Sequence, residues 1–144
     1  MIPAGQLGSL LPGFVASDLS GHKIDSSELL NRVALIDFWA TWCAPCRKEM
    51  PGYQKLLDQD GSRGFVVVGF KVDTMNDMDD PRTFAQELGI HYPLLIGSEP
   101  IRNEFGGIQG LPTTFIYDHD GILRNKIIGF EYTANIEKMI KSLL

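Results

Sequence analysis

Two almost wholly apolar segments, residues 33–40 (VALIDFWA) and 65–72 (FVVVGFKV), constrain the fold of this chain more than any other feature. Runs of this length without alternation are typical of strands buried on both faces of a sheet. Residues 44–60 between them favour a helix with an apolar stripe that includes Met50 and Tyr53. A strand, a helix and a strand in this order predict a parallel pair of strands joined by a right-handed crossover.

Shorter predicted elements surround this unit. Residues 14–19 and 22–24 predict an N-terminal hairpin, and a helical turn follows at 26–30. The remaining expected elements are a helix opened by Asp80 and Pro81 and ending at Leu88, a strand at 94–96, a helix at 99–105, strands at 113–117 and 122–128, and a final helix at 133–144. The turn between the last two strands is short, so these strands should form an antiparallel hairpin. We expect one α/β domain over residues 1–144 with a mixed central sheet.

Composition and charge narrow the possible functions. The 144 residues carry 18 acidic and 13 basic side chains, a formal net charge of -5. This balance argues against a nucleic-acid partner, because phosphate binding needs clustered Lys and Arg. No apolar run is long enough to span a bilayer. Residues 1–11 lack the basic flank and apolar stretch of a signal peptide, so either the protein is cytoplasmic or a leader has been removed.

The only two cysteines, Cys43 and Cys46, share one C-x-x-C motif where the first apolar segment ends and the predicted helix begins. A thiolate at a helix N-terminus faces unpaired backbone N–H groups and about half a positive charge from the helix dipole. Such sites lower a thiol pKa from about 8.5 towards about 7, and only the thiolate attacks a disulfide. We therefore expect a redox-active dithiol in which an exposed Cys43 attacks and a shielded Cys46 resolves the mixed disulfide.

Three other interpretations of the cysteine pair are weaker. A structural disulfide over so short a loop would stabilise the fold by only roughly 2 kcal/mol, against about 4.7 kcal/mol for a 100-residue loop. A zinc site needs about four ligands, and His22, His91 and His119 are scattered without ligand spacing. Inert buried thiols are the third interpretation. Redox exchange is favoured over all three, and we expect neither a metal nor a cofactor.

Asp37 is the only charged residue in the first apolar segment. A buried carboxylate without a partner is costly, so this position needs an explanation. Asp37 is either a proton acceptor beneath the dithiol, with a pKa raised by desolvation, that helps Cys46 lose its proton, or an Asp at a sheet edge with access to solvent. The sequence leaves both interpretations open.

Two tryptophans and a proline complete the set of unusual residues. Trp39 is expected in the core, whereas Trp42 should flank the dithiol as an apolar contact surface. Pro112 precedes a predicted strand and needs a structural reason there, because proline is rare in strands. Only about 5–6% of X–Pro bonds are cis, so spacing alone favours a trans Leu111–Pro112 bond.

Together these residues resemble the thioredoxin superfamily. The resemblance runs from Val33 to the C-terminus and rests on residues 37–40 (DFWA), 42–46 (WCAPC), a helix-bending Pro51 and 111–113 (LPT). It implies a thioredoxin fold, a cis Leu111–Pro112 bond beside the dithiol, and docking of an extended substrate strand on the backbone before the proline. The residues expected to bind substrate are Trp42, Ala44, Pro45, Leu111 and Pro112.

Within the superfamily the chain is more similar to the TlpA/ResA-like branch than to small thioredoxin. The similarity lies in the N-terminal extension (residues 1–30), the run 38–51 (FWATWCAPCRKEMP) and an insert at about 74–108. It implies a periplasmic or otherwise extracytoplasmic reductant, and many members of this branch serve cytochrome c maturation. Asp37 departs from the branch, where many members carry Asn. Some members also use an acid after the second strand, for which Asp73 is the candidate.

The sequence thus predicts a thiol–disulfide oxidoreductase that reduces protein disulfides, since Ala44-Pro45 resembles the dipeptide of reducing members. Its expected partners are disulfide-containing or dithiol proteins and an upstream electron donor, and we expect a monomer. The alternatives are a dedicated reductant for cytochrome c maturation and a non-catalytic protein-binding module. A peroxidase is disfavoured, because it would need Thr or Ser where Ala40 stands.

Overall fold

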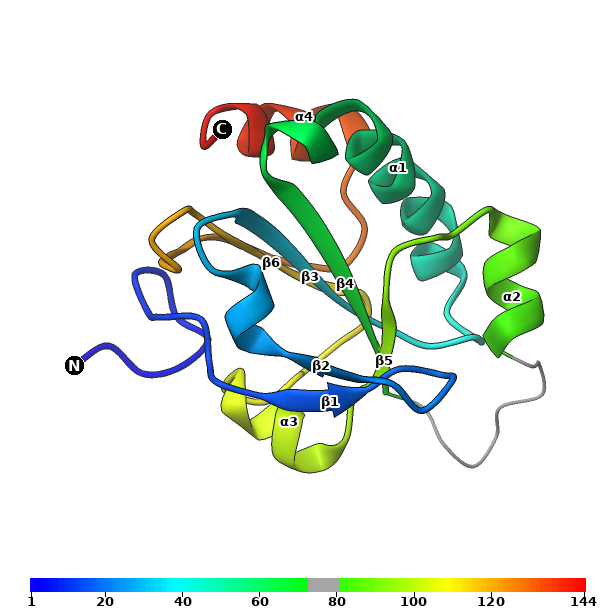
Figure 1. Ribbon diagram of the computed structural model, residues 1–144, viewed down its shortest axis with the longest axis horizontal. Coiled ribbons are helices and arrows are strands. Elements are labelled where there is room, and N and C mark those ends of the chain that lie inside the picture. Colours follow the sequence, from blue (N-terminus) through cyan, green and yellow to red (C-terminus); the bar gives the residue numbers. More distant parts are fainter. Residues whose placement is uncertain (73–80) are drawn as a thin grey trace.

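A five-stranded mixed sheet forms the centre of the molecule in the computed structural model, which describes residues 1–72 and 81–144 (Figure 1). The strand order is β5-β4-β3-β6-β7. The strands are β3 (Val33–Trp39), β4 (Phe65–Lys71), β5 (Leu94–Ile96), β6 (Thr113–Tyr117) and β7 (Leu123–Ile128). Strands β3, β4 and β5 are parallel, whereas β6 is antiparallel to both β3 and β7.

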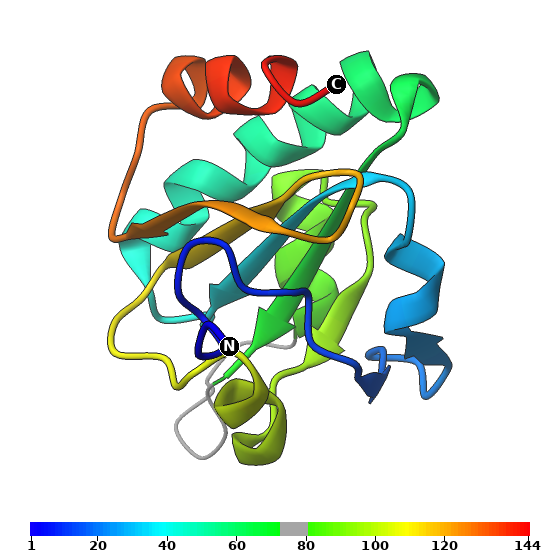
Figure 2. The same ribbon diagram turned by 90° about the vertical axis from the view of Figure 1, so that its left-hand side faces the viewer.

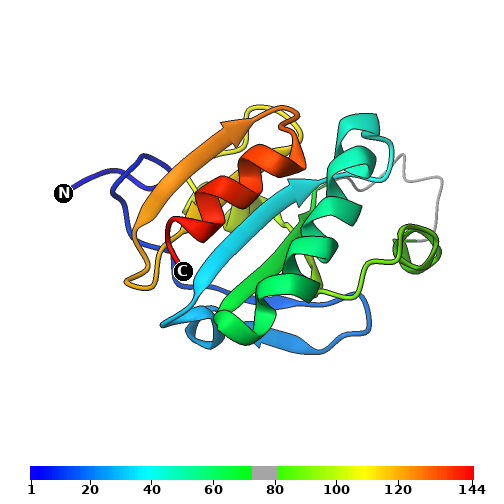
Figure 3. The same cartoon turned by 90° about the horizontal axis from the view of Figure 1, so that it is seen from above.

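Helices cover both faces of this sheet (Figures 1, 2 and 3). The elements on one face are α1 (Ala44–Asp60), α2 (Pro81–Leu88) and α4 (Thr133–Lys141). Those on the other face are the hairpin of β1 (Val15–Ser17) and β2 (Lys23–Asp25), the 3₁₀ turn η1 (Ser26–Leu29) and α3 (Glu99–Glu104). A second 3₁₀ turn, η2 (Gly61–Arg63), follows α1. Among the described helices, none has both the length and the hydropathy to cross a membrane.

Strand β3 lies in the middle of the sheet, and every one of its residues is buried. Because side chains alternate along a strand, Leu35 and Trp39 pack on the α1 side while Ile36 and Phe38 pack on the α3 side. Asp37 therefore faces the α1 side as well, between two apolar neighbours. This alternation explains why the segment lacks any polar pattern in the sequence.

The predicted element types and the mixed sheet are confirmed, and the differences lie at the ends of elements. The observed strands β3 and β4 stop one residue before the predicted ends, because strand pairing ends at Trp39 and Lys71. The last helix ends at Lys141 instead of Leu144. The strands of the N-terminal hairpin cover residues 15–17 and 23–25 instead of 14–19 and 22–24, because only these residues pair. The predicted capping residue Asp80 and the start of the insert near residue 74 lie outside the described residues.

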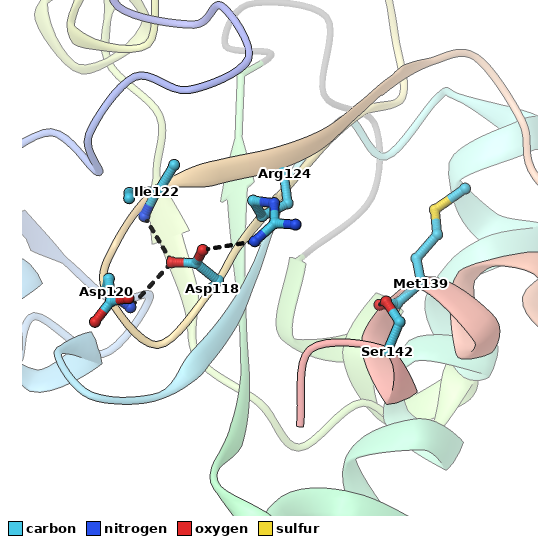
Figure 4. A network of polar contacts seen from close by, with 6 residues as sticks. All are labelled: Asp118, Asp120, Ile122, Arg124, Met139 and Ser142. Carbon is cyan, nitrogen blue, oxygen red and sulfur yellow. Dashed lines mark hydrogen bonds and ion pairs between the residues drawn. The ribbon is translucent and has the colours of Figure 1, made fainter.

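The turn between β6 and β7 is fixed by one carboxylate (Figure 4). Asp118 accepts hydrogen bonds from the backbone N–H groups of Asp120 (2.9 Å) and Ile122 (3.0 Å). Its other oxygen accepts from Nη1 of Arg124 at 3.1 Å. This turn returns the chain along β6, which carries the Thr114 side chain described below.

Candidate active site

The two cysteines lie at the junction of β3 and α1, at the N-terminal end of the helix. Cys43 is the N-cap residue of α1, and its Sγ accepts a hydrogen bond from the backbone N–H of Cys46 at 3.3 Å. The structure holds the pair as a Cys43–Cys46 disulfide with its Cα atoms 5.3 Å apart. The sulfur atoms thus lie at the positive end of the helix dipole, as the sequence predicted.

The prediction that Cys43 is exposed is wrong for this oxidised state. Only 4% of Cys43 is accessible to solvent, and Cys46 is fully buried at 0%. Cys43 has little exposed surface because its sulfur is bonded to the buried sulfur of Cys46. Cys43 still has the only solvent-accessible surface of the pair.

The two tryptophans beside the dithiol differ as predicted. Trp39 is completely buried and stacks on Phe84 of α2 with ring centroids 4.9 Å apart. Trp42 is 63% exposed directly before Cys43. An aromatic side chain this exposed next to a reactive sulfur is available to contact a partner protein.

A cleft of about 430 Å³ lies beside the disulfide and joins three distant parts of the chain. Its lining residues are Trp42, Val72, Arg102, Ile108, Gln109, Gly110 and Leu111. The Leu111–Pro112 peptide bond is cis, as the family resemblance implied. Pro112 itself is buried and does not line the cleft, so Gly110 and Leu111 form this side of the cleft surface.

Ala44 and Pro45 line a second hollow of about 350 Å³, separate from the first. The other residues of its lining are Lys48, Phe130 and Tyr132. Phe130 and Tyr132 are 43% and 69% exposed, and their rings meet edge to face at 5.2 Å. Nothing in the sequence pointed to these two aromatic residues, because they lie in the segment before α4, more than 80 positions from the cysteines.

Asp37 is completely buried on the α1 side of the sheet. Within the described part of the chain, neither of its carboxylate oxygens has a hydrogen-bond partner. Burial raises the pKa of Asp37 well above its ordinary value, and the nearby charge of Glu49 raises this pKa further. The alternative of a solvent-exposed Asp at a sheet edge is wrong, because Asp37 is paired with Gly69 on one side and Thr114 on the other.

Glu49 is another buried carboxylate on the α1 side of the sheet, and it was not among the residues predicted from the sequence. It is 2% exposed and accepts hydrogen bonds from the Glu131 backbone N–H (2.6 Å) and the Tyr53 hydroxyl (2.9 Å). Burial is the largest influence on Glu49 and raises its pKa, against the lowering effect of these two hydrogen bonds. Its spacing along the helix could have indicated this position. Glu49 follows Cys46 by three residues and precedes Tyr53 by four, so all three share the buried face of the helix.

A disulfide at a helix N-terminus, a cis proline and a mixed sheet of this order together define a redox-active protein of the thioredoxin fold. The chain belongs to the AhpC/TSA family, whose profile matches residues 7–126.

Known relatives agree with this assignment. The thiol-disulfide oxidoreductase ResA of Bacillus anthracis is 30% identical over 138 residues, which cover 96% of this chain and 79% of ResA. The thioredoxin-like protein YneN of Bacillus subtilis is 32% identical over 135 residues, covering 94% of this chain and 79% of YneN. A thiol:disulfide interchange protein of the thioredoxin family from Chlorobium tepidum superposes with a TM-score of 0.86 at 28% identity, covering 97% of this chain and 99% of that chain. The chain is a thiol–disulfide oxidoreductase with Cys43 and Cys46 as its C-x-x-C pair.

Proposed function

We propose that this chain reduces protein disulfides by dithiol exchange. The observation that carries the proposal is the position of the Cys43–Cys46 disulfide at a helix N-terminus, next to an open cleft and on the same side of the sheet as the buried carboxyl of Asp37. The Ala44-Pro45 dipeptide between the cysteines resembles that of reducing members of the superfamily and supports this direction. An upstream electron donor then returns the disulfide to the dithiol.

The proposed reaction has two steps. The thiolate of Cys43 attacks one sulfur of the partner's disulfide, the partner's S–S bond breaks, and its other sulfur leaves as a thiolate. Cys46 then gives its proton to Asp37, and its thiolate attacks the sulfur of Cys43. The Cys43–Cys46 disulfide forms and the partner's second sulfur leaves. The partner gains two electrons and two protons, the Cys46 proton by way of Asp37 and the other from solvent, and the dithiol loses both electrons.

The proposed docking surface surrounds the disulfide. In this proposal Trp42 and Leu111 contact one side of the partner segment, and Pro112 holds the backbone of Leu111 in place. Ala44 and Pro45 are assigned to the other side. Support comes from the lining of the two hollows, since each includes exposed aromatic side chains, Trp42 in the first and Phe130 with Tyr132 in the second. An extended partner strand would gain backbone hydrogen bonds here and place its disulfide over Cys43.

Replacing Cys46 by serine tests the exchange mechanism. Incubation of the reduced variant with a disulfide-bonded peptide is expected to accumulate a mixed disulfide on Cys43, because no second thiol remains to resolve it. Mass spectrometry before and after treatment with dithiothreitol identifies the adduct and the cysteine of this chain that carries it. The control is the double Cys43→Ser, Cys46→Ser variant, which should form none. If Cys46→Ser stays unmodified, the exchange mechanism is wrong, and biological activity retained by the double variant would instead support a non-catalytic binding module.

The reduction potential of the pair tests the direction of electron flow. Equilibration with glutathione buffers is expected to give a potential more negative than about −180 mV, towards the values of reducing dithiol proteins. A less negative value would make the protein an oxidant of its partners and contradict the reductase assignment.

The proposed compartment is extracytoplasmic, with the cytoplasm as the alternative. Protein disulfides form and persist mainly outside the cytosol, so the substrates of a disulfide reductase are abundant there. Fractionation of the host cell distinguishes these two locations.

A further inference from the structure

The hydroxyl group of Tyr53 links two elements of the active site that are far apart in the sequence. Tyr53 lies on α1, seven residues after Cys46 and on the same buried face. Its oxygen is 2.9 Å from Oε2 of Glu49, to which it donates, and 2.9 Å from Oγ1 of Thr114 on β6. A tyrosine has one proton to donate, so with Glu49 as acceptor the Thr114 hydroxyl must donate to Tyr53. The order of donation is therefore Thr114 to Tyr53 to Glu49.

This chain of hydroxyl groups ends beside Asp37. Thr114 is the direct partner of Asp37 in the antiparallel pairing of β6 with β3, so the two side chains lie on the same face of the sheet. On the other side of Asp37, the paired residue of β4 is Gly69, which contributes no side chain. The cross-strand neighbours of the buried carboxyl are thus one hydroxyl group and one glycine, and neither can neutralise it.

The charged and titratable groups around Asp37 come from several elements. Helix α1 contributes Cys46, Glu49 and Tyr53, and the segment before β5 contributes Tyr92. Lys71 follows Gly69 by two positions on β4 and is partly buried. Both Asp37 and Glu49 raise the pKa of Tyr53 and Tyr92 in addition to the larger effect of burial, so these hydroxyls stay protonated.

We propose that Tyr53 is a positioning residue for disulfide exchange, which holds the Glu49 carboxylate on the Asp37 side of the sheet and so restricts proton transfer from Cys46 to Asp37 to the less acidic part of the pH range. This inference rests on the proposed function. In this assignment Tyr53 acts on the exchange reaction through Glu49, to which it donates its hydrogen bond. Glu131 holds the other oxygen of Glu49 through its backbone N–H, so both Glu49 oxygens are fixed.

The direction of the effect follows from the charges. The hydrogen bond from Tyr53 favours the ionised form of Glu49, and ionised Glu49 raises the pKa of Asp37. Loss of the Tyr53 hydroxyl therefore favours neutral Glu49, and Asp37 then ionises at lower pH. Since Asp37 accepts the Cys46 proton only when it is ionised, the resolution step should become faster on the acidic side of its pH profile.

Stopped-flow kinetics with a disulfide reagent that releases a coloured thiolate separates the two steps, since attack releases the first thiolate and resolution the second. The expected result is a resolution rate on the acidic side that rises roughly threefold in Tyr53→Phe and roughly tenfold in Glu49→Gln. The double variant should match Glu49→Gln alone, because Tyr53 acts through Glu49. The matched control is Tyr117→Phe, since Tyr117 is also a buried tyrosine but lies on the opposite face of the sheet.

Three outcomes would overturn the inference. These are a Tyr53→Phe pH profile that superposes on the wild-type profile, a similar shift in Tyr117→Phe, and effects of Tyr53→Phe and Glu49→Gln that simply add. If Tyr53→Phe does not fold, Thr114→Val removes the other end of the hydroxyl chain and is expected to shift the profile in the same direction. Failure of the proposed function is a different result, because wild-type protein would then release no first thiolate at any pH.

Discussion

Replacing Cys43 by serine is expected to abolish disulfide exchange, with a loss of at least about 10³-fold in the rate of peptide disulfide reduction. A serine hydroxyl does not ionise near neutral pH and forms no S–S bond, so the first step of the reaction has no nucleophile. Cys46 does not replace it, because Cys46 is completely buried. The measurement is reduction of a fluorescent peptide disulfide under single-turnover conditions.

Cys46→Ser is the matched control for this prediction. It removes the same disulfide and therefore the same stabilisation, roughly 2 kcal/mol for so short a loop. Equal thermal stability of the two variants would show that the lost activity of Cys43→Ser is chemical. The roles of the two cysteines would be reversed if Cys43→Ser formed the mixed disulfide and Cys46→Ser did not.

Replacing Asp37 by asparagine is expected to slow the resolution step by about 10²-fold or more near neutral pH, while attack by Cys43 changes little. The amide has nearly the shape of the carboxyl group but accepts no proton from Cys46. The two phases of thiolate release measure attack and resolution separately. An equal loss in both phases would mean that Asp37 supports the site's structure and has no specific part in proton transfer.

The same substitution should stabilise the folded protein at high pH. The pKa of Asp37 is raised well above its ordinary value of 3.8 by burial and then by Glu49, so the folded chain holds this proton over a range where the unfolded chain has lost it. Wild-type stability therefore falls as pH rises above about 4, by up to about 1.4 kcal/mol per pH unit until the folded pKa is passed.

Asp37→Asn removes this dependence. Its free energy of unfolding should exceed that of the wild type by about 2 kcal/mol or more at pH 8 and by little at pH 4. Urea denaturation of the reduced proteins at both pH values measures the difference. If the free energies of unfolding of the wild type and Asp37→Asn differ by the same amount at both pH values, Asp37 is not protonated in the folded chain.

Much of the fold could be predicted because the decisive signals are local. The apolar runs at 33–40 and 65–72 predicted β3 and β4, and both are buried on two faces. Each run by itself indicates a buried strand, since a strand with no exposed face needs no polar positions. The ends of elements were less predictable, because a strand stops where its neighbour stops pairing, as β3 does at Trp39.

The sequence by itself determined the reacting atoms of this protein. The C-x-x-C motif lies directly at the start of α1, with Cys43 as its N-cap. The end of the strand, the start of the helix and the cysteine pair could therefore be predicted from one short stretch of sequence. Only the tertiary structure decided what surrounds them. Tyr53 meets Thr114 across 61 positions and Glu49 meets Glu131 across 82, through the packing of α1 on the sheet. These contacts depend on strand register and helix placement, which arise from the whole core and leave no local pattern in the sequence.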